Sequence, residues 1–192
     1  MSLFPKSATQ YQALADIPRG PNSGVFTVDP ASGSASNPGT TFESPLLSVT
    51  AGFEKCTTNQ NDAVVFVGGP TSFQPTAGIT QSLGFTHLVG LSGDLPGMGQ
   101  RCRIVNTAAN DLATLFTLSG SGCIVKNIQF FDGKDNAADG ACVLVSGDRN
   151  YFKNVFVAGM GDATASGPFS RAGSYSLKVT GSENFFEDCT IG

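Results

Sequence analysis

The sequence is poor in charge and in the side chains that mark common catalytic centres. Of its 192 residues only 14% are Asp, Glu, Lys or Arg, one is histidine (His87), and none is tryptophan. The low charge excludes a coiled coil and a charge-rich disordered chain. Lys and Arg total 11 against 15 Asp and Glu, and no basic cluster is available to neutralise a row of phosphates. We therefore expect no nucleic-acid partner.

Long hydrophobic runs are also missing. The longest covers residues 63–67, far short of the ~20 residues that cross a bilayer. Residues 1–20 lack the apolar core, about 7–15 residues long, of a secretory signal. The sequence therefore predicts a soluble protein that is made in the cytoplasm of a host cell and has no membrane partner.

The five cysteines are widely spaced and form no CxxC pair, and His87 is the only imidazole that could join them as a metal ligand. We interpret them as free thiols in the protein interior. The Gly pairs at 68–69 and 97–99 do not precede a helix, as a phosphate-binding loop must. We expect no metal, no nucleotide and no other cofactor.

What is abundant is glycine, with 24 residues, and an internal repeat. The segments 116–127, 143–154 and 177–188 align without a gap, and 86–93 is a weaker fourth copy. Each copy begins with a short β-rich strand that ends in Ser/Thr-Gly, followed by a turn and a second strand. Equivalent residues lie 27 to 37 positions apart, so the pattern is constant while the connecting loops vary in length.

The apolar alternation changes phase at Asn127, Asn154 and Asp188, which predicts a sharp bend at each. Asn and Asp enter the left-handed conformation more easily than most residues. A bend repeated in every copy, with no helical pattern between copies, indicates a coil that stacks on itself as a parallel β-helix. In this fold the three residues form a hydrogen-bonded ladder at one corner.

The repeat also predicts ion pairs between neighbouring coils. Lys153 should lie over Glu187, and Arg149 over Glu183. The alternative fold is an antiparallel β-sandwich, but the Asp-Gly pairs that suit its hairpins lie away from the repeated turn.

A short helix is expected before the repeat, from about residue 45 to 56. Ser44 is a suitable N-cap, Pro45 suits the first helical position, and apolar residues follow at helical spacing. Such a helix can cover the open first coil. The segment beginning at Asp62 is then expected to form the first strand of the coil.

The region before the helix resembles the N-terminal part of the pectate-lyase-like superfamily of right-handed parallel β-helix proteins. The matching positions are Val28, Pro30, Gly33, Ser34, Asn37, Pro38, Gly39 and Thr40. This chain has Ala35 where many members have Asp. The resemblance covers about residues 25–192 and implies the fold but no activity, because the superfamily includes lyases, hydrolases, tailspikes and inert scaffolds. Three short elements, at residues 152–154, 159–161 and 181–186, resemble phage virion proteins.

The chain is therefore divided into an attachment arm (1–24), an N-terminal strand with the capping helix (25–61), and coils (62–192). Prolines punctuate the arm, and Tyr11, Leu14 and Ile17 form an apolar stripe that the coils do not need. We expect this stripe to bind a partner.

Candidates for catalysis are few. Asp132, Asp135 and Asp139 share one loop but match no EF-hand, so we interpret that loop as solvated. Arg171 lies in a Gly- and Ser-rich loop, and His87 has no nucleophile motif near it, which favours a packed or surface histidine. No catalytic residue is assigned.

We expect a structural protein of a phage virion, a tailspike, tail fibre or capsid-decorating component, that contacts other virion proteins as a homotrimer. The alternative is a polysaccharide lyase or glycoside hydrolase that acts on cell-surface or extracellular polysaccharide; host surface polysaccharide is a partner in either case. The last repeat ends at Gly192 with its coil unfinished, so we also expect that the chain continues or that a partner covers this coil.

Overall fold

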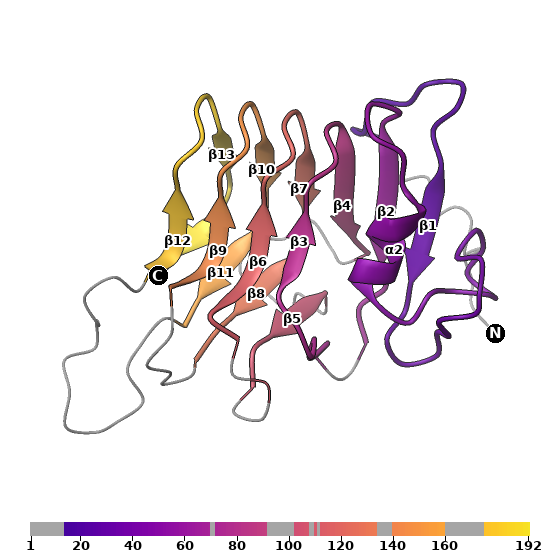
Figure 1. Cartoon of the computed structure of the whole chain (residues 1–192), viewed down its shortest axis with the longest axis horizontal. Coiled ribbons are helices and arrows are strands. Elements are labelled where there is room, and N and C mark those ends of the chain that lie inside the picture. Colours follow the sequence, from indigo (N-terminus) through magenta and orange to yellow (C-terminus); the bar gives the residue numbers. More distant parts are fainter. Residues whose placement is uncertain are drawn as a thin grey trace.

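The computed structural model describes residues 14–69, 72–91, 102–107, 110, 112–133, 140–159 and 175–192. Tyr11, Asp135, Asp139 and Arg171 lie outside these ranges. In Figure 1 the strands lie side by side along the long axis of the molecule, from β1 near the N-terminus to β12 and β13 near the C-terminus. Within the described ranges, no helix has the length and apolar character that a membrane span requires.

Three parallel sheets form the walls of the molecule. Sheet A contains β1 (Val25–Val28), β2 (Asp62–Phe66), β4 (Thr86–Gly90), β7 (Ile124–Lys126), β10 (Tyr151–Lys153) and β13 (Phe185–Glu187). Sheet B contains β5 (Arg103–Val105), β8 (Gln129–Phe131), β11 (Phe156–Ala158) and β14 (Thr190–Ile191). Sheet C contains β3 (Ile79–Gln81), β6 (Thr114–Leu118), β9 (Ala141–Val145) and β12 (Tyr175–Val179). Each coil runs from sheet C to A to B, and the fold is the predicted right-handed parallel β-helix.

The pairing register reproduces the alignment of the repeat. Residue 116 pairs with 143 and 143 with 177 in sheet C, while 126 pairs with 153 and 153 with 187 in sheet A. The weaker copy is in the same register, because Val89 pairs with Lys126 and so brings Gly90 beside Asn127. Identical positions in the repeat are therefore identical positions in the coil cross-section.

Buried side chains stack between coils in the space that the three sheets enclose. The rings of Phe152 and Phe186, in neighbouring coils, stack with centroids 4.7 Å apart. Within one coil, Phe116 of sheet C stacks on Phe130 of sheet B at the same distance. Because each layer packs on the next at the strand spacing of ~4.8 Å, the core is a column rather than a sphere.

The helix is shorter and begins later than the sequence predicts. Helix α2 covers Val49–Lys55, and its N-cap is Ser48, whose side chain accepts a hydrogen bond from the Ala51 amide. The predicted N-cap Ser44 and start at Pro45 are wrong, because Leu46 is bonded to the edge of β1 through its backbone N–H and C=O. Val49 and Phe53 of α2 are buried in the core, so the helix packs on the first coils as expected.

Candidate functional site

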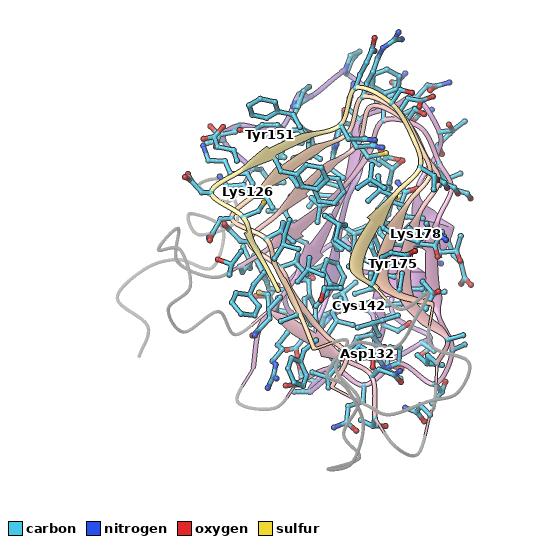
Figure 2. The ribbon with its side chains drawn as sticks, turned by 90° about the vertical axis from the view of Figure 1, so that its left-hand side faces the viewer. Lys126, Asp132, Cys142, Tyr151, Tyr175 and Lys178 are labelled. Carbon is cyan, nitrogen blue, oxygen red and sulfur yellow. The ribbon has the colours of Figure 1, made fainter. Side chains whose placement is uncertain are left out.

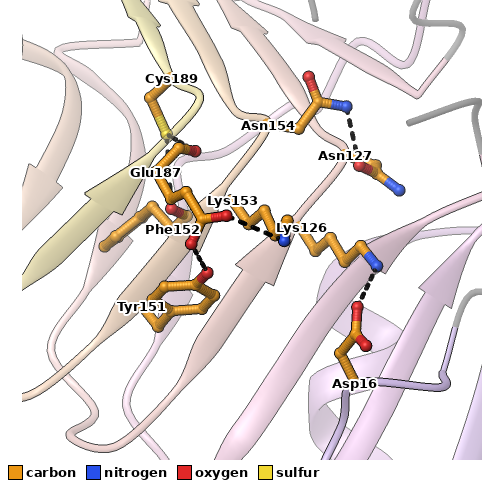
Figure 3. A network of polar contacts seen from close by, with 9 residues as sticks. All are labelled: Asp16, Lys126, Asn127, Tyr151, Phe152, Lys153, Asn154, Glu187 and Cys189. Carbon is orange, nitrogen blue, oxygen red and sulfur yellow. Dashed lines mark hydrogen bonds and ion pairs between the residues drawn. The ribbon is translucent and has the colours of Figure 1, made fainter. Parts of the chain in front are cut away.

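The three residues of the predicted corner ladder follow β7, β10 and β13. Asn127, Asn154 and Asp188 have φ values of 58°, 51° and 52°, the left-handed region. The Asn154 Nδ2 donates a hydrogen bond to the Asn127 Oδ1 at 2.9 Å, as Figure 3 shows, and both asparagines are buried. Side chains used in this way hold two coils together and are not available to a ligand.

A second amide ladder lies at the preceding turn, and the sequence reasoning missed it. The Cys123 amide donates to Asn150 Oδ1 at 2.8 Å, and the Asn150 amide donates to Asn184 Oδ1 at 2.9 Å. Asn184 in turn donates to the Gly147 carbonyl at 3.0 Å. The signal was present in the sequence, since Asn occupies the same repeat position in both copies. These residues are also structural.

The end of the predicted arm lies against the β-helix. Asp16 forms an ion pair with Lys126 of sheet A, at 2.8 Å between Oδ2 and Nζ, and only 5% of the lysine side chain is exposed. Ile17 is 5% exposed, so it is buried within this chain and is not part of a free stripe. Leu14 is half-buried. The partner-binding role predicted for these residues therefore has no free surface at Ile17.

His87 is a packed histidine. Its Nδ1 accepts a hydrogen bond from the Ile124 amide at 3.1 Å, which requires the neutral ring with its proton on Nε2, and Nε2 lies 3.2 Å from Asn61 Oδ1. Burial, helped by the nearby charge of Arg19, lowers the pKa of His87 to about 4. The ring is 1% exposed and so does not reach a substrate.

Asp132 is not solvated, contrary to the interpretation of its loop. The side chain is fully buried, and both carboxylate oxygens accept from Asn106 Nδ2, at 3.2 and 3.1 Å. Among the described residues no group of three or more His, Cys, Asp or Glu side chains is placed to hold a metal ion. The five cysteines carry no disulfide, and Cys102, Cys123 and Cys142 are buried.

The outer face of sheet A carries a cluster of charged and aromatic groups at its C-terminal coils (Figure 3). Lys153 Nζ lies 3.0 Å from Glu187 Oε1, the predicted ion pair, and the Tyr151 hydroxyl donates to the other carboxylate oxygen. The bond from Tyr151 and the nearby lysine lower the pKa of Glu187. The Tyr151 ring stacks on Phe185, with centroids 5.6 Å apart. Since each polar group has a partner within the cluster, we interpret it as a contact between coils.

The outer face of sheet C is different, because its charged group is not ion-paired within the described residues. Tyr175 is 45% exposed, and the Lys178 Nζ lies 5.3 Å from the centre of its ring, a cation–π contact. Figure 2 shows the two on the β12 side of the body, opposite Tyr151 and Lys126. In register with Lys178 are Leu144, Thr117 and Thr80 of the preceding strands. The four strands of this sheet contain no Asp, Glu or His.

A groove of about 750 Å³ lies at the N-terminal end of sheet C. It separates the first turn of α2 from residues 72–77, which lead into β3. Its lining consists of Pro30, Leu47, Ser48, Thr50, Ser72, Phe73, Gln74, Pro75, Thr76 and Ala77. No sequence motif indicated this groove, because its two walls come from segments that carry no repeat.

Comparison with known proteins finds similarity in structure and none in sequence. No family model and no curated protein matches the sequence. Among solved structures, the chain is similar to pectin methylesterase PemA from Erwinia chrysanthemi, with a TM-score of 0.56 and 15% identity over 90% of this chain. It is also similar to a rhamnogalacturonan lyase, with a TM-score of 0.53 and 15% identity over 87% of this chain.

The similarity establishes the fold. The chain spans about half the length of both solved structures, 49% and 51% respectively. These parallel β-helix neighbours are enzymes that act on polysaccharides.

Proposed function

We propose that this protein recognises a polysaccharide along the outer face of sheet C. The observation that carries the proposal is the exposed pair of Tyr175 and Lys178 on a strand face with no competing carboxylate. An aromatic ring offers an apolar surface to the C–H face of a sugar, and a lysine offers a charge to an acidic substituent. The enzymes with this fold, a pectin methylesterase and a rhamnogalacturonan lyase, support a polysaccharide as the ligand class.

The shape of the sheet suits an extended polymer. Strands of sheet C follow one another at ~4.8 Å along the long axis, so their outward side chains form rows in that direction. The row through Lys178 includes the hydroxyls of Thr117 and Thr80, which can donate to and accept from sugar hydroxyls. A polymer chain that follows the axis meets Lys178, the apolar Leu144 and then the two hydroxyls, one side chain per coil.

Cleavage of the bound polysaccharide would require catalytic groups in addition to a binding surface. Lyase or hydrolase chemistry needs a proton donor and a proton acceptor beside the bound sugar. The strands of sheet C supply neither a carboxylate nor an imidazole. Of the candidates that the sequence offers, Asp135 and Asp139 precede β9 and Arg171 precedes β12. Release of unsaturated or reducing sugars from polygalacturonate or a neutral glucan, abolished in an Asp139→Asn variant, would assign catalysis.

Binding is tested by affinity electrophoresis and calorimetry with polygalacturonate and a neutral glucan. We expect wild type to bind the acidic polymer, and Tyr175→Ala and Lys178→Ala to bind it at least tenfold more weakly, since a desolvated cation or aromatic contact contributes about 1–2 kcal/mol. Phe85→Ala and Lys55→Ala, which change an exposed aromatic and a basic residue elsewhere, are the controls. If the wild type binds and both Tyr175→Ala and Lys178→Ala bind equally well, the polysaccharide-binding surface is not on sheet C.

The second candidate is a structural component of a phage virion, attached through residues 1–24 and trimeric. It is favoured by the three short elements at residues 152–154, 159–161 and 181–186, which resemble phage virion proteins. A protein that binds no polysaccharide but co-purifies with virus particles as a trimer would support this candidate over the first.

A further inference from the structure

The groove at the N-terminal end of sheet C has a lining without charge. Its ten residues combine hydroxyl and amide groups with Phe73, Leu47, two prolines and an alanine. An uncharged lining does not compensate the desolvation of an ionised ligand, which is costly in a partly buried site. The volume of about 750 Å³ lies within the usual range for small-molecule sites. The ligand class that fits is neutral, with both hydroxyl and apolar faces.

One wall of the groove is held in place by the β-helix. The Phe73 amide donates to the Arg103 carbonyl at 2.8 Å, and the Val105 amide donates to the Phe73 carbonyl at 2.8 Å. Asn110 donates to the Pro75 carbonyl at 2.9 Å. The backbone of this wall is therefore fixed before any ligand arrives, which reduces the entropy cost of binding.

The polar side chains at the rim are free to bind. Gln74 and Thr76 are exposed, and no hydrogen bond joins either side chain to the rest of the described residues. Opposite them, Leu47 is 44% exposed beside the first turn of α2. Both walls of the groove thus combine polar groups with apolar surface.

The groove and Tyr175 lie at the same edge of sheet C, where its strands begin. A Cβ added to Gly78 would lie 2.7 Å from the Thr114 carbonyl oxygen, so the chain entering β3 stacks directly on Thr114. Thr114 pairs with Ala141, and Ala141 pairs with Tyr175. Three strand spacings, about 14 Å, separate the start of β3, beside the groove, from the start of β12 at Tyr175.

From these observations we infer that the groove is a subsite for a neutral sugar unit with an apolar substituent, such as a deoxy or O-methyl group. The inference rests on the proposed function, because the sugar belongs to the polymer that meets Lys178 at the other end of the sheet. The two ends then select for different units, and a polymer with both kinds of unit binds better than a uniformly charged one.

Two small sugars test the groove and the surface at Lys178 separately. Methyl rhamnoside is neutral and carries a methyl group, and methyl galactosiduronate is acidic. Binding is measured by NMR titration of the whole chain. We expect the double variant Leu47→Ala with Gln74→Ala to bind methyl rhamnoside at least fivefold more weakly than wild type and to bind methyl galactosiduronate with unchanged affinity. Lys178→Ala should do the reverse. Gln129→Ala and Ile191→Ala, outside the groove, are the matched controls.

The outcomes distinguish the two proposals. If methyl rhamnoside does not bind, or binds the groove variant as well as wild type, the neutral subsite is wrong while polymer binding at Tyr175 and Lys178 stands. If methyl rhamnoside binds in the groove but no polysaccharide binds, the subsite stands and the proposed function fails. Binding of a proline-rich peptide in place of the glycoside would also overturn the inference.

Discussion

Single residues at the corners fix the path of the chain. The first corner of each coil carries a left-handed residue at one repeat position, occupied in turn by Phe85, Gly122, Arg149 and Glu183. Only Gly122 could be anticipated, because Phe, Arg and Glu show no preference for this conformation. At the second corner Asn and Asp occupy the position, and the sequence reasoning located it. Both corners have the same left-handed backbone, and only the second carries residue types that reveal it in the sequence.

Replacing Asn154 tests the second corner. Asn154→Val should lower the free energy of unfolding by about 2–4 kcal/mol, since a β-branched side chain is strained at φ 51° and the bond to Asn127 is lost. Asn154→Gly removes the bond without the strain and should cost about 1 kcal/mol. Urea unfolding of both variants gives the two values. Equal losses would show that backbone strain plays no part.

His87 makes stability depend on pH. Its folded pKa of about 4 lies below the ordinary 6.5, so the unfolded chain binds the proton more tightly. The stabilisation is complete above pH 6.5 and is lost as the pH falls towards 4, by up to about 3 kcal/mol. Urea unfolding between pH 7.5 and 4 measures the slope. The free energy of unfolding of the variant His87→Asn, which keeps an acceptor for the Ile124 amide, should depend less steeply on pH. An equal dependence on pH would show that His87 is not its source.

At the scale of elements, the turn between sheets C and A explains why each repeat contains Ser/Thr-Gly. A Cβ on Gly120 would lie 2.4 Å from the Leu83 carbonyl oxygen, and one on Gly147 or Gly181 would lie 2.0 Å from a carbonyl oxygen of the preceding coil. The turns of successive coils therefore touch backbone to backbone. Any side chain at this position forces the coils apart.

The variant Gly147→Ala measures this close approach. We expect a loss of at least about 3 kcal/mol, because the contact is with a backbone oxygen that cannot move without displacing its own coil. Gly69→Ala, where an added Cβ meets nothing within 4 Å, should be nearly neutral. Thermal and urea unfolding give both values. A mild effect at Gly147 would mean that the turns slide past each other easily.

The elements outside the repeat were harder to anticipate. Both Ser44 and Ser48 precede an apolar run, and local preference favours Ser44 because a proline follows it. The backbone of Leu46 is instead bonded to Thr27 and Asp29 on the edge of β1, which delays the helix. Pairing with a strand about 20 residues away is not visible in a local pattern.

At the scale of the whole molecule, the sequence sufficed for the fold and not for the candidate site. Three aligned copies fixed the order, the register and one corner, because every coil repeats the same contacts. Lys178 lies within the third copy and Tyr175 two residues before it, and the two residues differ from their equivalents Leu144 and Ala141. A property that only one coil has does not show in a repeat, and the groove is formed by segments that have no repeat at all.

Among the described residues, the strands of the last coil pair on one side only. Val179 and Ile191 are 42% and 48% exposed, and their strands have a free edge. We expect the 192-residue chain to self-associate through this end, and Val179→Lys with Ile191→Lys to suppress the association by charging the edge. Sedimentation velocity over a range of concentrations measures it, with Leu47→Lys as a control at the other end. A monomer at all concentrations would contradict the expectation.

From β6 onward, two corners of each coil are closed by short, bonded turns, and only the third, between sheets B and C, varies in length. Equivalent residues lie 27 positions apart in one coil and 34 in the next, and the whole difference falls between β11 and β12 as compared with β8 and β9. An insertion at this corner leaves every ladder, pair and stacked ring in register. Loops of new length and sequence can therefore arise before the strands of sheet C, beside Tyr175, while the β-helix that carries them stays the same.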